Sequence, residues 1–187
     1  MLDVGCGQGI LLSLLLAARE RYQAESWPAG WPPPPVDLDL RGIERNAHDV
    51  GRAQRALGER VRIEQIDLCE LPRLAASNVI VLLDVLQYLP EEAQERLLAS
   101  VAHALTPAGV LIARVSDAAA GLSSIVTRAV DYAVSVARGP LVRNCRSAQE
   151  WIALLERLAF SVSAEPMSRG TPFANVLLVA RPTRRAQ

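Results

Sequence analysis

The chain opens with Met1-Leu2-Asp3-Val4-Gly5-Cys6-Gly7-Gln8-Gly9, and an apolar run from Ile10 to Leu16 follows directly. A short apolar segment that passes through spaced glycines into a helical pattern predicts a strand, a tight turn and a helix N-terminus. Glycines in such a turn adopt positive φ and let the main chain approach a ligand closely. The spacing is Gly-x-Gly-x-Gly, so the dinucleotide fingerprint, which requires a glycine at the position of Ile10, is incomplete.

Beyond this turn, apolar runs alternate with helical patterns along the whole chain. After the first strand, which Val4 closes, we predict strands over Val36–Ile43, Arg60–Ile66, Asn78–Asp84, Val110–Val115, Phe160–Ala164 and Asn175–Ala180. We predict helices over Ile10–Tyr22, Asn46–Leu57, Pro90–Leu105 and Ser147–Leu158. The alternation predicts an α/β fold with a doubly wound, mostly parallel, seven-stranded sheet and helices on both faces. No helix separates the last two strands, so the last strand should run antiparallel.

Length and composition limit the classes of function. A chain of 187 residues predicts one domain, and 21% charged residues with zero net charge give no basic surplus for nucleic acid. The 20 cationic residues are all arginine, so no lysine can form a Schiff base; with the many alanines, this indicates a GC-rich, bacterial genome.

Cysteines and histidines give no sign of a disulfide or metal site. Cys6, Cys69 and Cys145 are odd in number and scattered, which favours a reducing compartment, and neither they nor the two histidines have metal-ligand spacing. The apolar run after the glycines is too short to span a membrane, and no basic segment precedes it. We therefore expect a cytoplasmic protein.

The run Asp3-x-Gly5-x-Gly7-x-Gly9 resembles motif I of the class I S-adenosylmethionine (SAM)-dependent methyltransferases. Five βα units closed by a final hairpin are also similar to the seven-stranded sheet of that family. The resemblance implies an enzyme that uses SAM as its cofactor. In doubly wound sheets the ligand lies at the carboxyl ends of the strands.

The resemblance assigns a role to the end of each of the first three strands. Asp3 would orient the cationic amino group of SAM, and the glycines would wrap its methionine and ribose portions. Glu44 would accept hydrogen bonds from the ribose hydroxyls, and Asp67 one from the adenine amine. The complete predicted cofactor-binding set is Asp3, Gly5, Cys6, Gly7, Gly9, Glu44, Arg45, Asp67, Leu68 and Asp84.

The fourth strand ends in Leu83-Asp84-Val85-Leu86-Gln87-Tyr88-Leu89, which the resemblance places beside the methyl sulfonium. The predicted catalytic residues are Asp84, Gln87 and Tyr88, with Asp117 as a further candidate. Many relatives have Asp-Val-Leu-His-Tyr-Leu here, and Gln87 replaces the histidine; glutamine can orient a nucleophile but cannot take its proton. The segment is not the Asn/Asp-Pro-Pro-Tyr/Phe run of enzymes that methylate amines in nucleic acids, so a small organic or lipid-like acceptor is expected.

Residues 118–146 hold an amphipathic insertion, interpreted as a substrate-side or interface element, and a homodimer is possible. The chain begins inside the first strand, so we expect that the usual N-terminal cap of the single domain 1–187 is lacking and that upstream residues would stabilise it. Two other functions stay open: a catalytically silent methyltransferase-like partner subunit and, less favoured, an NAD(P)-dependent oxidoreductase.

Overall fold

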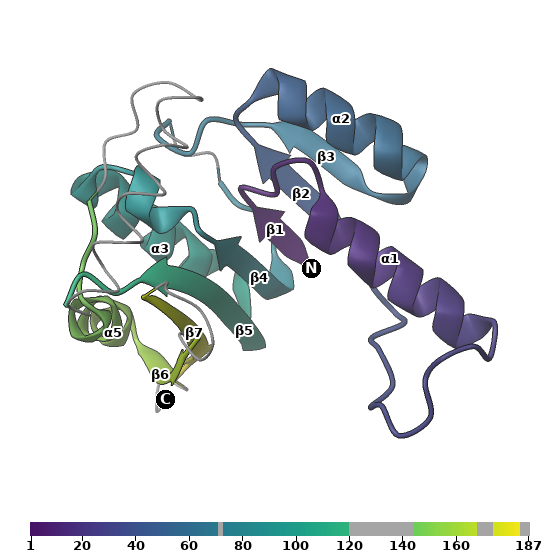
Figure 1. Cartoon of the computed structure of the whole chain (residues 1–187). Helices are drawn as coiled ribbons and strands as arrows, with labels where there is room; N and C mark the ends of the chain where they lie inside the picture. Colours follow the sequence, from purple (N-terminus) through teal and green to yellow (C-terminus); the bar gives the residue numbers. More distant parts are fainter. Residues whose placement is uncertain (71–72, 120–143, 168–173, 184–187) are drawn as a thin grey trace. The chain divides into compact units, whose positions relative to one another are not determined.

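The computed structural model describes residues 1–70, 73–119, 144–167 and 174–183. They form two compact units, Met1–Asp67 and Leu68–Gln187, which are described separately (Figure 1). The seven strands have the order β3-β2-β1-β4-β5-β7-β6. The predicted fold class, a mostly parallel seven-stranded α/β sheet whose last strand is antiparallel, is confirmed.

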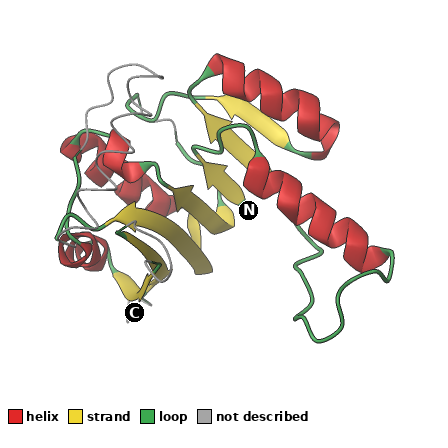
Figure 2. Cartoon of the chain, viewed as in Figure 1, coloured by secondary structure: helices red, strands yellow, loops and turns green. Residues whose placement is uncertain are grey.

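The first unit alternates strands and helices (Figure 2). Its elements are β1 (Leu2–Val4), α1 (Ile10–Gln23), β2 (Arg41–Glu44), α2 (Ala47–Leu57), a 3₁₀ turn (Gly58–Arg60) and β3 (Arg62–Gln65). Strand β2 pairs parallel with β1 on one side and with β3 on the other. The carboxyl ends of the three strands therefore lie at one edge, and each is followed by a residue of the predicted site.

Helices α1 and α2 pack with strand and loop residues into one apolar core. Its members include Leu12 and Leu16 from α1, and Ala53 and Leu57 from α2. Burial of these side chains, at about 25 cal/mol for each Å² of apolar surface, holds the unit together. Asn46 caps the N-terminus of α2, because its side chain accepts hydrogen bonds from the N–H groups of His48 and Asp49 in the first turn.

The second unit holds the other four strands. Its elements are β4 (Ser77–Leu83), a 3₁₀ turn (Leu86–Tyr88), α3 (Glu91–Ala104), β5 (Leu105–Ser116), α5 (Ala148–Arg157), β6 (Phe160–Pro166) and β7 (Asn175–Pro182). Strands β4 and β5 are parallel, whereas β7 is antiparallel to both β5 and β6. Ser147 and Glu150 form the capping box of α5.

Two predicted boundaries differ from the structure by five residues. The strand expected over Val36–Ile43 is confined to Arg41–Glu44, because β1 offers pairing partners only to Arg41, Gly42 and Ile43. The strand expected over Val110–Val115 is part of β5, which begins earlier, at Leu105, because that residue already pairs with Ser77. Main-chain pairing, not local composition, sets both limits.

The predicted insertion at 118–146 lies mostly outside the described residues, which stop at 119 and resume at 144. Among the helices that the structure describes, none has the length and apolar character needed to cross a membrane. Within the described ranges, no cluster of histidine, cysteine or acidic side chains could hold a metal ion.

Candidate functional site

The loop after β1 turns sharply because its glycines adopt a conformation that side chains disfavour. Gly5, Gly7 and Gly9 have φ of 76°, 54° and 79°. The main-chain N–H of Gly5 donates to the carbonyl oxygen of Ile43 at 2.8 Å. The N–H of Cys6 donates to the same oxygen at 3.0 Å, so both bonds tie the loop to the adjacent strand β2.

Gly7 and Gly9 are glycines for different reasons. A Cβ atom at Gly9 would lie 2.6 Å from Cδ1 of Leu57 and 3.3 Å from Cβ of Ala53, so this glycine permits α1 and α2 to pack closely. A Cβ at Gly7 would have no atom within 4 Å. Because Gly7 has no side chain and the space at its Cβ position is empty, a ligand could approach its main chain closely.

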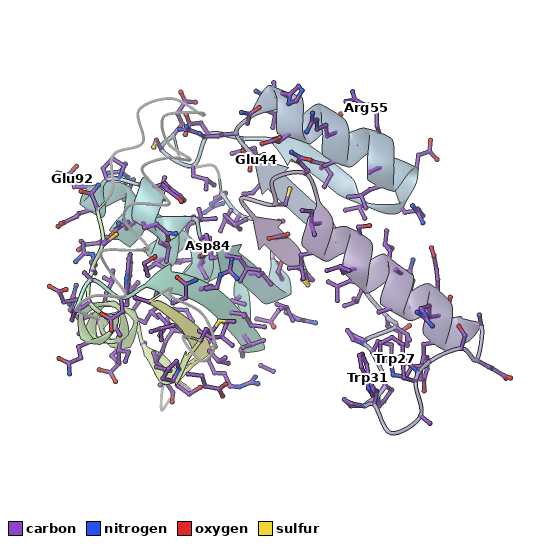
Figure 3. All side chains as sticks on the ribbon, in the orientation of Figure 1. Trp27, Trp31, Glu44, Arg55, Asp84 and Glu92 are labelled. Atoms are coloured by element: carbon purple, nitrogen blue, oxygen red, sulfur yellow. The ribbon has the colours of Figure 1, made fainter. Side chains whose placement is uncertain are left out.

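Glu44, the last residue of β2, binds the glycine loop through its carboxylate. Its Oε2 accepts a hydrogen bond from the N–H of Gly7 at 3.1 Å, and its Oε1 accepts one from the N–H of Asn46 at 2.8 Å. Each carboxylate oxygen has two lone pairs, so both retain capacity to accept a bond from a ligand. The side chain therefore fixes the loop and is placed beside it for binding (Figure 3).

Negative charge surrounds the loop. Asp3 is only 4% exposed, and burial, with repulsion from Glu44, raises the pKa of its carboxyl to about 6. Burial also raises the pKa of the Cys6 thiol to about 12, and the charges of Asp3, Glu44 and Asp49 add to the shift. Cys6 is therefore a neutral, packed side chain at physiological pH, and it lies near three acidic residues.

The other predicted cofactor residues of the first unit, Arg45 and Asp67, lie after the carboxyl ends of β2 and β3. Arg45 is exposed, and its carbonyl oxygen accepts a hydrogen bond from Nε2 of Gln65 at 3.3 Å. Asp67 lies two residues beyond the end of β3. The residue before it, Ile66, donates its N–H to the carbonyl oxygen of Glu44 at 3.0 Å. The structure thus brings Asp3, Glu44 and the glycines together and leaves Arg45 and Asp67 on the exposed rim.

In the second unit, Asp84 is bound by an arginine. Nε of Arg114 donates to Oδ1 of Asp84 at 2.9 Å, and Nη2 of Arg114 pairs with Oδ2. The N–H of Asp84 also donates to the carbonyl oxygen of Arg114 at 3.1 Å, and Asp84 has a φ of 58°. A role for Asp84 as a proton acceptor would require this pair to open.

The remaining predicted residues follow β4 or precede it. Gln87 is 2% exposed, and its side-chain Oε1 has no hydrogen-bond partner. Tyr88 is half-buried in the same 3₁₀ turn, and Leu68 is buried. An unpaired oxygen on a buried side chain is rare and indicates that a donor from a ligand or water can bind there.

Sequence reasoning missed the residues that hold this turn. Nε2 of the buried Gln94 donates to the carbonyl oxygens of Leu86 at 3.0 Å, Leu89 at 3.1 Å and Asn144 at 2.8 Å. Oε1 of Gln94 accepts from Nε of Arg146 at 2.9 Å. The sequence held one sign of this role. Gln94 is a polar residue on the helix face that also carries the buried apolar residues 97, 98 and 101.

A family described as a methyltransferase domain matches residues 2–111 of the chain. The chain belongs to this family. The predicted family and the prediction that the chain is a methyltransferase are confirmed. No curated protein matches the chain.

Solved structures, two of them of methyltransferases, share the fold. A DhpI complex with S-adenosylhomocysteine (SAH) is 18% identical, with a TM-score of 0.65 over 98% of this chain and 76% of that one. Magnesium protoporphyrin IX methyltransferase from Synechocystis PCC 6803 with bound SAH is 20% identical, with a TM-score of 0.65 over 97% and 73%. Mitomycin 7-O-methyltransferase MmcR is 22% identical, with a TM-score of 0.67 over 97% and 48%. At these identities the likeness supports the fold.

Proposed function

We propose that this methyltransferase-family chain binds SAM at the glycine loop and transfers its methyl group to a small organic or lipid-like acceptor. The proposal rests on one observation: the space at the Cβ position of Gly7 is empty, and the acids Asp3 and Glu44 lie beside this glycine's loop. Structures of similar fold that contain SAH or SAM support the choice of cofactor.

The charge of the loop discriminates between the candidate cofactors. SAM carries a sulfonium and an ammonium group, which the carboxylates of Asp3 and Glu44 would attract. A dinucleotide would bring a pyrophosphate dianion to the same loop, where Asp3, Glu44 and Asp49 already raise the pKa of Cys6 by their negative charge. The acids therefore favour SAM over NAD(P), in agreement with the incomplete dinucleotide fingerprint.

The residues of the first unit divide the binding between them. Asp3 would face the ammonium group, and Glu44 would accept hydrogen bonds from the ribose hydroxyls. The main chain around Gly7 would contact the methionine and ribose portions of the cofactor. The bound cofactor supplies an activated methyl group for in-line displacement. Because that group needs no further activation, the chain's main contribution is to align the acceptor with it.

The residues after β4 supply the acceptor side of the proposal. Gln87 Oε1 can accept a hydrogen bond from an N–H or O–H of the acceptor and so orient it, but cannot remove its proton. Tyr88 lies in the same turn, and Asp84 carries a charge that Arg114 balances. A cytoplasmic location, a homodimer and the absence of nucleic acid as substrate remain part of this proposal.

Isothermal calorimetry of the full chain with SAM, SAH and NADH tests the cofactor. We expect saturable binding of SAM and SAH and none of NADH. Formation of SAH from SAM in the presence of candidate acceptors then separates an enzyme from a silent partner subunit. Tight NADH binding without a response to SAM would reject the proposal.

Glu44→Gln tests where the cofactor binds. Glutamine retains one acceptor oxygen but loses the charge and one acceptor, and a charged hydrogen bond contributes about 1.5–3 kcal/mol. We expect the affinity for SAH to fall by roughly 10-fold to 100-fold. Glu64→Gln, an exposed change in the neighbouring strand β3, is the control and should leave the affinity unchanged.

A further inference from the structure

In the first unit, hydrogen bonds hold the loop after α1 against the end of the helix. Helix α1 ends at Gln23, and Glu25 then adopts a φ of 54° and donates its N–H to the carbonyl oxygen of Tyr22 at 3.1 Å. Both the N–H and the Oγ of Ser26 donate to the carbonyl oxygen of Arg21, at 2.9 and 3.0 Å. These bonds fold the chain back on the helix end and bring Trp27 against Tyr22.

Three aromatic rings meet there nearly at right angles. The rings of Tyr22 and Trp27 have centroids 6.5 Å apart and an interplanar angle of 79°. Those of Trp27 and Trp31 are 5.7 Å apart at 85°, and both tryptophans are labelled in Figure 3. Nε1 of Trp27 donates to the carbonyl oxygen of Pro32 at 3.1 Å, so the proline run that follows holds the Trp27 ring in place.

An open pocket of about 600 Å³ lies between these groups. Tyr22, Gln23, Glu25, Trp27 and Val36 line it. Glu25 carries the only charge among these five residues, and it is negative. We call this pocket the aromatic corner.

We propose that the aromatic corner binds an organic cation of the alkylated ammonium class. The faces of tryptophan and tyrosine rings carry negative electrostatic potential and attract a cation within about 6 Å. The Glu25 carboxylate adds an attraction that a neutral apolar ligand would not feel and that would repel an anion. A quaternary ammonium group, which is bulky and weakly hydrated, fits a corner of two rings and one acid better than a compact ion does.

The corner is independent of the proposed cofactor site. None of its residues belongs to the glycine loop or to the ends of β1, β2 and β3. The corner would therefore bind its ligand whether or not the chain binds SAM. Since the rings are partly exposed, each should contribute only about 2-fold to 5-fold in affinity, which places the expected dissociation constant in the millimolar range.

Tryptophan fluorescence of the full chain reports on this site. Two of the three tryptophans, Trp27 and Trp31, stand on this loop, whereas Trp151 is fully buried. Tetramethylammonium chloride is titrated at constant ionic strength, with excess SAH present because the acids of the glycine loop also attract cations. tert-Butanol, a neutral compound of similar branching, is titrated in parallel. We expect a saturable change with the cation and none with the alcohol.

Variants locate the binding. Glu25→Gln should weaken tetramethylammonium binding several-fold, and Tyr22→Leu by about 2-fold to 5-fold. Glu20→Gln removes the same charge from the same helix but outside the pocket, where Glu20 pairs with Arg60, and should leave the affinity unchanged. No saturable response, an equal response to tert-butanol, or an equal loss in Glu20→Gln would overturn the proposal. Failure of SAH to bind would not overturn it, because the difference between the Glu25→Gln and Glu20→Gln variants still shows where the cation binds.

Discussion

Asp3 illustrates at the residue scale how a binding group can reduce stability. Its carboxylate is 4% exposed and lies near a second acid, Glu44, so burial and repulsion raise its pKa from 3.8 to about 6. The folded state then holds a proton that the unfolded chain would release. The stability from this proton is fully present below pH 3.8 and is lost as the pH rises through about 6.

Asp3→Asn should therefore stabilise the protein in a pH-dependent way. Above pH 6 the variant removes a buried charge, and we expect the free energy of unfolding to rise by about 1–3 kcal/mol. Near pH 3.5 the carboxyl is mostly protonated in both states, and most of the difference should disappear. Urea denaturation at the two pH values measures this. The variant should also bind SAM more weakly, because the ammonium group loses its counter-charge. A stability gain independent of pH would show that the charge is not the cause.

At the scale of elements, the glycine loop joins β1 to α1 with two glycines that have separable purposes. Gly9 lies against Leu57 and Ala53 of α2, whereas Gly7 faces open space. One glycine serves packing between helices, and the other serves access to the main chain. Substitution by alanine should separate these purposes.

Gly9→Ala combines a 2.6 Å clash with a positive φ, and we expect a loss of about 2–4 kcal/mol in the free energy of unfolding. Gly7→Ala has the strained φ alone and should lose about 1–2 kcal/mol. The order should reverse for ligand binding, because a methyl group at Gly7 occupies the cradle: SAH affinity should fall at least about 10-fold there. Thermal melts and calorimetry on the two variants check both rankings. Equal effects on binding would argue against the cradle.

The second unit depends on a polar contact inside its core. Gln94 is fully buried and its Nε2 reaches three carbonyl oxygens, two in the turn after β4 and one at Asn144. The N–H of Asn144 in turn donates to the carbonyl oxygen of Gln87 at 3.0 Å. The conformation of the turn that carries Gln87 and Tyr88 therefore rests on a side chain from α3.

Gln94→Leu keeps the volume of the side chain but leaves these carbonyls and Nε of Arg146 without their partner. We expect a loss of about 2–4 kcal/mol in the free energy of unfolding, measured by urea denaturation. Gln149→Leu, an exposed position on α5, should change it by less than about 0.5 kcal/mol. Similar effects of the two changes would show that the buried amide is not needed.

For the molecule as a whole, cofactor binding and folding should be linked. A ligand present at about 100 times its dissociation constant, and bound by the folded state alone, stabilises it by about 2.7 kcal/mol. For a chain of 187 residues, this predicts that SAH raises the melting temperature by about 5–10 °C. Scanning calorimetry with SAH, and with NADH as the control, measures the shift. An equal shift with NADH would contradict the preference for SAM and SAH over a dinucleotide.

The sequence by itself determined the features that depend on neighbours along the chain. Periodicity predicted the α/β fold and most helix ends to within about a residue, because a helix or strand displays its buried face at fixed spacing. The absence of a helix between the last two strands predicted that the last strand is antiparallel. Local chemistry predicted the glycine turn, since its residues lie within a few positions of each other. The assignment of Asp3 and Glu44 to the site came from the resemblance to the methyltransferase family.

Only the tertiary structure decided what those residues contact. Glu44 binds Gly7 across 37 positions, Arg114 binds Asp84 across 30, and Arg146 binds Gln94 across 52. Such partners come within hydrogen-bond distance only once strands and helices lie side by side, and no local pattern records them. The same holds for Gly7 and Gly9, which look alike in sequence. One faces open space and the other a helix because packing of α2 reaches only the second.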